Sequence, residues 1–168
     1  KGQAQQNHAP SPHQLQTALR STFEQLLQSA TQSDQATFMA YEASLVQKVR
    51  ELGKLLLMLF LCVREQRSRA QTPQTVRLQD HSYALRPAQP RNLSTMFGPI
   101  RYWRSYLRGK GGRGLHPLDV ELGLTTDRLS MNLLSLCSRL ATMLSYAKVH
   151  TTLGWFLGSA PSTEVIEQ

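Results

Sequence analysis

The chain is poor in cysteine, in aromatic residues and in long hydrophobic runs. Cys62 and Cys137 are far apart and show no CxxC or Cys/His spacing, which argues against an internal zinc site. The longest apolar run, residues 55–63, is far shorter than the roughly 20 residues of a membrane span, and no apolar signal segment stands near the start. These absences predict a cytoplasmic protein with reduced thiols and with no metal, no small-molecule cofactor and no membrane partner.

Acidic residues are also scarce in one part of the chain. The whole chain has 19 Lys and Arg against 11 Asp and Glu, a formal net charge of +8. Residues 66–118 contain ten Lys and Arg and one acid, Asp80, so this segment carries +9 and the other 115 residues sum to −1. A local surplus of this size favours a polyanionic partner such as nucleic acid, although it says little about the fold.

Helical periodicity dominates the first region, residues 1–74, which we interpret as a helical leader. One helix is expected over residues 13–30, and a long amphipathic helix from Ser33 or Asp34 to Arg69. In the long helix apolar residues recur every seven positions. That repeat fits a helix facing the core, and it leaves open a homodimer through residues 34–69.

The second region, residues 75–116, alternates apolar and polar residues with period two. This pattern predicts a small antiparallel β-ribbon with breaks at Pro87 and Pro90 and a tight turn at Gly98-Pro99. A glycine-rich basic loop, residues 109–114, ends the ribbon. The loop spells GxGxxG, but it lacks the buried parallel strand and following helix of a dinucleotide site.

The third region, residues 117–168, is expected to be helical, which makes the whole chain mainly α with a small β-ribbon, an α+β fold. Ser130 and Ser145 are predicted to cap two helices, and Gly158 to end the second. A last helix beginning at Ser162 gives this end the layout of a helix-turn-helix, although a structural corner fits equally well.

Arginines alternate with aromatic residues in the ribbon segment 100–108. Arginine binds phosphate oxygens with paired donors, aromatic rings stack on bases, and a two-stranded ribbon fits the major groove of DNA. A solvated edge ribbon is the alternative. The residues expected to contact DNA are Arg101, Trp103, Arg104, Tyr106, Arg108, Lys110 and Arg113, together with Ser162 and Thr163 at the start of the last helix.

No catalytic group is expected. Three acids, Asp119, Glu121 and Asp127, lie close together in sequence, but metal-dependent strand transfer needs carboxylates from separate elements of a larger domain. We interpret these three as surface acids near helix starts. The five histidines are scattered, and no serine or cysteine has an identifiable base.

Motifs between residues 93 and 168 resemble the N-terminal region of bacterial insertion-sequence transposases of the ISKra and ISLre kind, which are DDE transposases. The matching pieces are Thr95–Arg101, Arg104, Tyr106, Gly112, Gly114, Pro117–Asp119, Leu122–Leu124, Leu136–Ala141, Ser145–Ala147, Gly158, Ser162 and Ile166. The resemblance implies recognition of transposon-end DNA ahead of an RNase H-like catalytic domain, which would follow residue 168. Many relatives have a CxxCG pair in the ribbon loop, where this chain has Arg108 and Gly111.

The sequence therefore predicts a DNA-binding N-terminal fragment of a transposase, associated with the nucleoid and acting in DNA transposition. A helical oligomerisation or adaptor protein, with an incidental basic surface, is the main alternative. An RNA-binding regulator is the third hypothesis.

Overall fold

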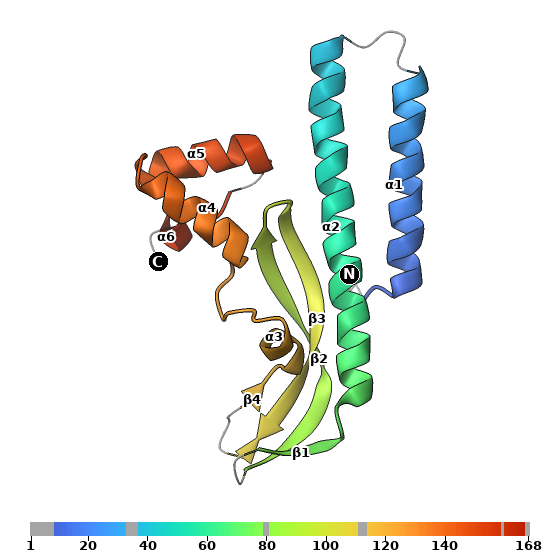
Figure 1. Ribbon diagram of the computed structural model, residues 1–168, viewed down its shortest axis with the longest axis vertical. Helices are drawn as coiled ribbons and strands as arrows, with labels where there is room; N and C mark the ends of the chain where they lie inside the picture. Colours follow the sequence, from blue (N-terminus) through green and yellow to red (C-terminus); the bar gives the residue numbers. More distant parts are fainter. Residues whose placement is uncertain (1–8, 33–36, 79–80, 111–113, 159, 167–168) are drawn as a thin grey trace, which may run out of the picture.

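The computed structural model describes residues 9–32, 37–78, 81–110, 114–158 and 160–166. Two long helices come first, followed by a four-stranded antiparallel sheet and a group of shorter helices (Figure 1). The chain is thus mainly α with a small antiparallel sheet, which confirms the predicted α+β class. In chain order the elements are α1 (Pro12–Gln32), α2 (Phe38–Gln71), β1 (Thr75–Leu78), β2 (His81–Thr95), β3 (Gly98–Gly109), β4 (Gly114–Leu115), α3 (Pro117–Glu121), α4 (Met131–Ala141), α5 (Tyr146–Leu157) and α6 (Thr163–Ile166).

Helices α1 and α2 form an antiparallel hairpin that extends beyond the sheet at one end (Figure 1). The bounds of α1 confirm the helix predicted over residues 13–30. Thr37 caps the start of α2, since its hydroxyl accepts a hydrogen bond from the Ala40 N–H and so satisfies a free donor of the first turn. The predicted caps Ser33 and Asp34 lie outside the described residues.

The sheet has the strand order β1-β2-β3-β4. The predicted breaks at Pro87 and Pro90 are wrong, because β2 runs through both prolines. The register with β3 shifts between Arg86 and Gln89, a bulge that takes Pro87 out of the regular ladder. Pro90 lies beyond the four β2 residues that pair with β1, so its missing N–H faces the unpaired edge of the described strand.

A tight turn joins β2 to β3, as the sequence predicted near Gly98. Thr95 pairs with Gly98 across the turn, and the Thr95 hydroxyl donates to the Gly98 carbonyl. Gly98 has a φ of 104°, which favours glycine. The ring of Phe97 at the tip lies where a Cβ on Gly53 of α2 would stand, so the turn packs directly on the helix.

A first hydrophobic cluster joins α2, the sheet and α3. Its buried residues are Leu61, Leu93, Ile100, Tyr102 and Leu118. Helix α2 packs against β3, and the Glu65 carboxylate accepts hydrogen bonds from the N–H and the hydroxyl of Ser105. The sheet and α3 are thereby held on one side of the long helix.

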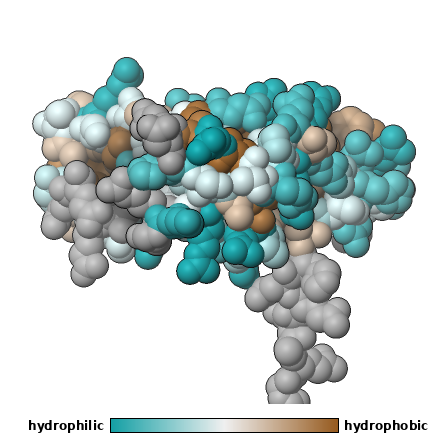
Figure 2. Space-filling model, turned by 90° about the horizontal axis from the view of Figure 1, so that it is seen from below, coloured by the Kyte–Doolittle hydropathy of each residue, from teal (hydrophilic) through white to brown (hydrophobic). Residues whose placement is uncertain are grey.

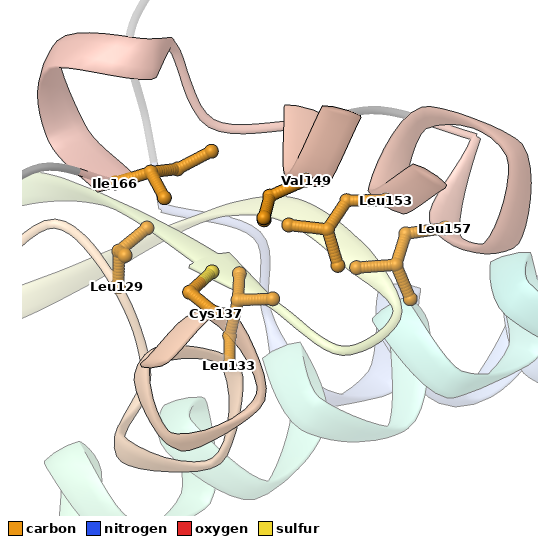
Figure 3. Packing of buried hydrophobic residues seen from close by; sticks show 7 residues of the cluster. All are labelled: Leu129, Leu133, Cys137, Val149, Leu153, Leu157 and Ile166. Atoms are coloured by element: carbon orange, nitrogen blue, oxygen red, sulfur yellow. The ribbon is translucent and has the colours of Figure 1, made fainter. Parts of the chain in front are cut away.

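A second cluster fills the space between the C-terminal helices (Figure 3). Ser130 caps α4 through a hydrogen bond from the Leu133 N–H, as predicted. Gly158 ends α5 in the left-handed conformation, also as predicted. The buried members are Leu129, Leu133, Cys137, Val149, Leu153, Leu157 and Ile166.

The apolar residues at the end of α5 differ in their burial. Phe156 is 70% exposed, and Leu157 takes the buried position instead. Leu153 and Leu157 lie four residues apart and therefore share the buried side of the helix. Trp155 is also exposed.

Hydrogen bonds from β2 and from α2 help to attach the C-terminal helices to the rest of the described chain. The backbone of Ser94 in β2 exchanges hydrogen bonds with Arg128 and Ser130, just before α4. Arg50 of α2 donates to the carbonyl oxygens of Trp155 and Phe156 at the end of α5. A cation at a helix C-terminus is favourable because the last carbonyls carry partial negative charge. Within the described part of the chain, the helices are too short or too polar to span a membrane.

Candidate nucleic-acid interface

Strand register divides the basic residues of the sheet between its two faces. Side chains alternate along a strand, and residues directly opposite each other on paired strands share a face. Arg77 pairs with Ser82, and Ala84 pairs with Arg108. Since residues 82, 84 and 86 of β2 alternate to one side, Arg77, Arg86 and Arg108 lie on the same face, which we call the basic face.

All three side chains of the basic face are exposed. None of their guanidinium groups has a hydrogen-bond or ion-pair partner within the described residues. The three strands are spaced by about 4.8 Å, so the face is about 10 Å across, comparable to the roughly 12 Å width of the DNA major groove. Seen from below, the described surface is largely hydrophilic, with apolar patches between the polar residues (Figure 2). The basic face can therefore accept anionic groups.

The Tyr106 ring borders the basic face beside β4. Tyr106 pairs with Arg86 in the register, and its ring centroid lies 5.1 Å from that of His116. A Cβ on Gly114 would collide with the Tyr106 ring, so the glycine lets β4 approach it closely. The His116 Nδ1 donates a hydrogen bond to the Ser105 carbonyl oxygen, and burial, followed by the nearby arginines, lowers the pKa of His116. Tyr106 is half-buried, so it packs while keeping part of its ring accessible.

Arg104 has a different role from the one expected. It forms an ion pair with Asp119 of α3, which also binds Arg91 at 3.0 Å and accepts a hydrogen bond from the Tyr102 hydroxyl at 3.0 Å. The interpretation of Asp119 as a surface acid is wrong, because this residue is only 8% exposed. The Arg104 guanidinium is thus occupied inside the protein.

The network around Asp119 ties the sheet to the segment after α3. Arg91 donates further hydrogen bonds to the carbonyl oxygens of Thr125 and Asp127. Burial is the main cause of two pKa shifts, raising the pKa of Tyr102 and lowering that of Arg104. Two arginines and one carboxylate leave a net positive charge in this largely buried site.

Arg101 and Trp103 lie on the opposite face from Arg108, by alternation along β3. The Arg101 guanidinium carbon stands 5.5 Å from the centre of the Trp103 ring, a cation–π contact. Both residues line a cavity of about 290 Å³ between α2 and β3, together with Cys62, Glu65 and Arg69 of α2. The arginines and aromatic residues that alternate along β3 therefore lie on two different faces of the sheet.

The remaining residues that were expected to contact DNA are not among the three that define the basic face. Lys110 is exposed at the end of β3, next to the basic face, and Arg113 lies outside the described residues. Ser162 and Thr163 stand at the start of α6, which packs on α4 and α5. The described part of α6 is one helical turn and follows the end of α5 at Gly158, so the helix-turn-helix stays a prediction.

The described residues contain no group of three or more His, Cys, Asp or Glu side chains placed to hold a metal ion. Both cysteines are free. Burial raises the pKa of the Cys137 thiol, which lies in the second core, and also that of Cys62, whose thiol contacts the Pro10 carbonyl. A raised pKa disfavours the reactive thiolate form.

The site residues that sequence reasoning missed are Arg77 and Arg86. They were counted in the basic segment but not assigned to a surface. Pairing β1 and β3 with β2 would have placed both beside Arg108, whereas the local arginine–aromatic pattern directed attention to β3 alone. Comparison with known proteins adds nothing here, since no protein-family model, curated protein or solved structure matches the chain.

Proposed function

We propose that this chain binds double-stranded DNA through the basic face of its sheet. The observation that carries the proposal is the placement of Arg77, Arg86 and Arg108 on one exposed face without an acidic partner in the described residues. Unpaired arginines at this spacing suit phosphate oxygens, which dominate the affinity of proteins for DNA. Lys110 extends the positive surface at the end of β3.

The motif resemblance supports a more specific form of the proposal. In that form the chain is the DNA-binding part of an insertion-sequence transposase, recognises transposon ends and associates with the nucleoid in the cytoplasm. Contacts to phosphates would position the protein, while base contacts from Tyr106 or the start of α6 would give specificity. The exposed Ser162 is consistent with the second of these.

A pair of triple variants tests binding by the basic face. Replacing Arg77, Arg86 and Arg108 with Ala should weaken binding to a duplex and lower the slope of log K against log salt by about 2.7, three times about 0.9 per phosphate contact. The control variant replaces Arg20, Arg139 and Lys148, which are exposed on helices. Both variants lose three positive charges, so a net-charge effect alone would weaken them equally.

The measurement is a fluorescence titration of one labelled duplex at several salt concentrations, with circular dichroism to confirm folding. Equal losses in the two variants would reject the basic face as the binding surface. Absence of any binding at low salt would reject DNA binding altogether and favour the adaptor function. Stronger competition by RNA than by duplex DNA would favour the RNA-binding regulator.

A further inference from the structure

Helix α2 carries an apolar stripe that the rest of the described chain leaves uncovered. The stripe consists of large side chains exposed by 38% to 81%: Phe38, Leu45, Val49, Leu56 and Phe60. With residues advancing by about 100° around a helix, these five positions fall within about 60° of one another. The stripe is therefore one narrow face of α2.

The other contacts of α2 use different sides of the helix. The Cys62 thiol donates a hydrogen bond to the carbonyl of Pro10, just before α1, and so marks the side of α2 that faces α1. Phe97 packs on Gly53, Arg50 binds the end of α5, and Leu61 enters the sheet core. On a helical wheel the stripe falls between the side that contacts α1 and the side that contacts the sheet. The upper part of the hairpin also stands clear of the sheet (Figure 1).

Helix α1 widens the same surface. Phe23 and Leu27 are each 54% exposed and lie about 80° and 120° around α1 from Leu15, which is buried in the helix hairpin. Around the axis of α2, the stripe lies at a similar angle, in the same sense, from the side of α2 that contacts α1. Because the two helices are antiparallel, equal rotations of the same sign lead to the same side of the hairpin.

The apolar area of this surface is large enough for a stable interface. If a fully accessible large apolar residue exposes about 150–200 Å², the seven exposed fractions amount to roughly 600–750 Å². A standard interface buries about 800 Å² on each partner, of which about 65% is apolar in homodimers, or about 500 Å². Monomeric proteins seldom expose so much contiguous apolar area.

The spacing of the residues points to a partner helix of the same kind. A first set of apolar residues recurs every seven positions, at Phe38, Leu45, Leu52 and Leu59. A second set lies four residues after members of the first, at Val49, Leu56 and Val63, so that the spacing between successive seam residues alternates between four and three. This is the heptad pattern of a coiled-coil seam. The first set has leucine at three positions and the second set has valine at two, and this combination favours a two-stranded coiled coil. Glu42 is the one polar residue among these eight seam positions.

We propose that two copies of this chain dimerise through the stripe on α2, with Phe23 and Leu27 of α1 at its margin. A second copy supplies a seam with the same repeat, so one surface serves both partners, as twofold symmetry requires. Dimerisation of this kind leaves the basic face of each copy free. It does not depend on DNA binding.

Light scattering after size-exclusion chromatography tests the proposal on the whole chain. At about 100 µM, well above a micromolar Kd, the measured mass should be twice the 18.9 kDa of one chain. Val49→Glu buries a charge in the seam and should raise the Kd of the dimer at least about a hundredfold, giving a monomer. The control Val120→Glu makes the same change at an exposed valine of α3 and should leave the dimer intact.

A second variant keeps the test decisive if Val49→Glu unfolds the chain. Under mild oxidation Val49→Cys should form a covalent dimer on a non-reducing gel, and Val120→Cys should not. A wild-type mass of 18.9 kDa at this concentration, or a mass above that of a dimer, would overturn the proposal. So would a folded Val49→Glu variant with the dimer mass unchanged.

Discussion

In the middle of the β2–β3 ribbon, Arg91 and Arg104 turn inward to Asp119, whereas at the β1 end the arginines of the basic face have no acidic partner in the described residues. The two groups come from the same strands and the same basic segment. Their difference lies in α3, which brings one carboxylate over the middle of the ribbon. A count of positive charges in sequence therefore overstates the surface available to an anion.

The largest effect that tests this comparison is expected for Asp119→Ala. The side chains of Asp119, Arg91 and Arg104 are 11%, 8% and 18% exposed, so the variant leaves two nearly buried cations without their carboxylate. Removing one partner of a buried ion pair costs about 3–5 kcal/mol of unfolding free energy. Urea unfolding followed by circular dichroism measures it. A loss below about 1 kcal/mol would show that the arginines reach water instead.

A smaller loss of stability is expected for Arg50→Ala. Arg50 also has an internal role, since it binds two carbonyl oxygens at the end of α5. Its hydrogen bonds are exposed, so the loss should be about 1 kcal/mol. Arg20→Ala, at an exposed arginine of α1, should change the unfolding free energy by less than about 0.5 kcal/mol. Equal losses of thermal stability in the two variants would contradict a stabilising role of Arg50 at the end of α5.

Single substitutions in β3 sharpen the comparison on the DNA side. Arg108 belongs to the basic face, and Arg101 stacks on Trp103 on the opposite face. Arg108→Ala should lower the slope of log K against log salt by about 0.9, as expected for one lost phosphate contact. Arg101→Ala should leave the slope unchanged. The reverse order, in titrations of the same duplex, would move the interface to the side of the Trp103 cavity.

Much of the fold was predictable because its signals are local. The period-3.6 and period-2 patterns indicated the helices and strands, and Ser130 and Gly158 marked helix ends by their own chemistry. Local rules failed at Pro87 and Pro90, where a bulge and an unpaired edge accommodate proline inside β2. Breaks were predicted at these prolines because neither the bulge nor the unpaired edge can be recognised until the pairing of the strands is known.

The candidate site was predictable only in part, because it depends on contacts between distant residues. The partner of Arg104 is Asp119, and only the docking of α3 on the ribbon brings them together. Arg77 and Arg86 join Arg108 through strand register, which periodicity along one strand does not reveal. Charge composition identified the segment correctly, and tertiary structure selected the residues within it.

The smallest effect concerns Glu65, a second buried carboxylate. Glu65 is as buried as Asp119, at 8% exposure, but its hydrogen-bond partners are neutral groups of Ser105. Its Oε2 atom has no hydrogen-bond partner among the described residues. Burial is the main cause that raises the pKa of Glu65 above its ordinary value of 4.5, outweighing the Ser105 hydrogen bonds and the nearby Arg69. The folded state thus holds the proton of Glu65 more tightly than the unfolded state does.

It follows that the contribution of Glu65 to stability is fully present below about pH 4.5 and is lost as pH rises through the folded pKa. Glu65→Gln keeps an oxygen acceptor for Ser105 and removes the titration. Wild type should therefore lose stability relative to the variant as the pH rises from about 4.5 through the raised pKa of folded Glu65. Thermal unfolding of both proteins across this range measures the difference, and all other titrating groups cancel. Parallel pH profiles would mean that water or Arg69 neutralises Glu65 as fully as the arginines neutralise Asp119.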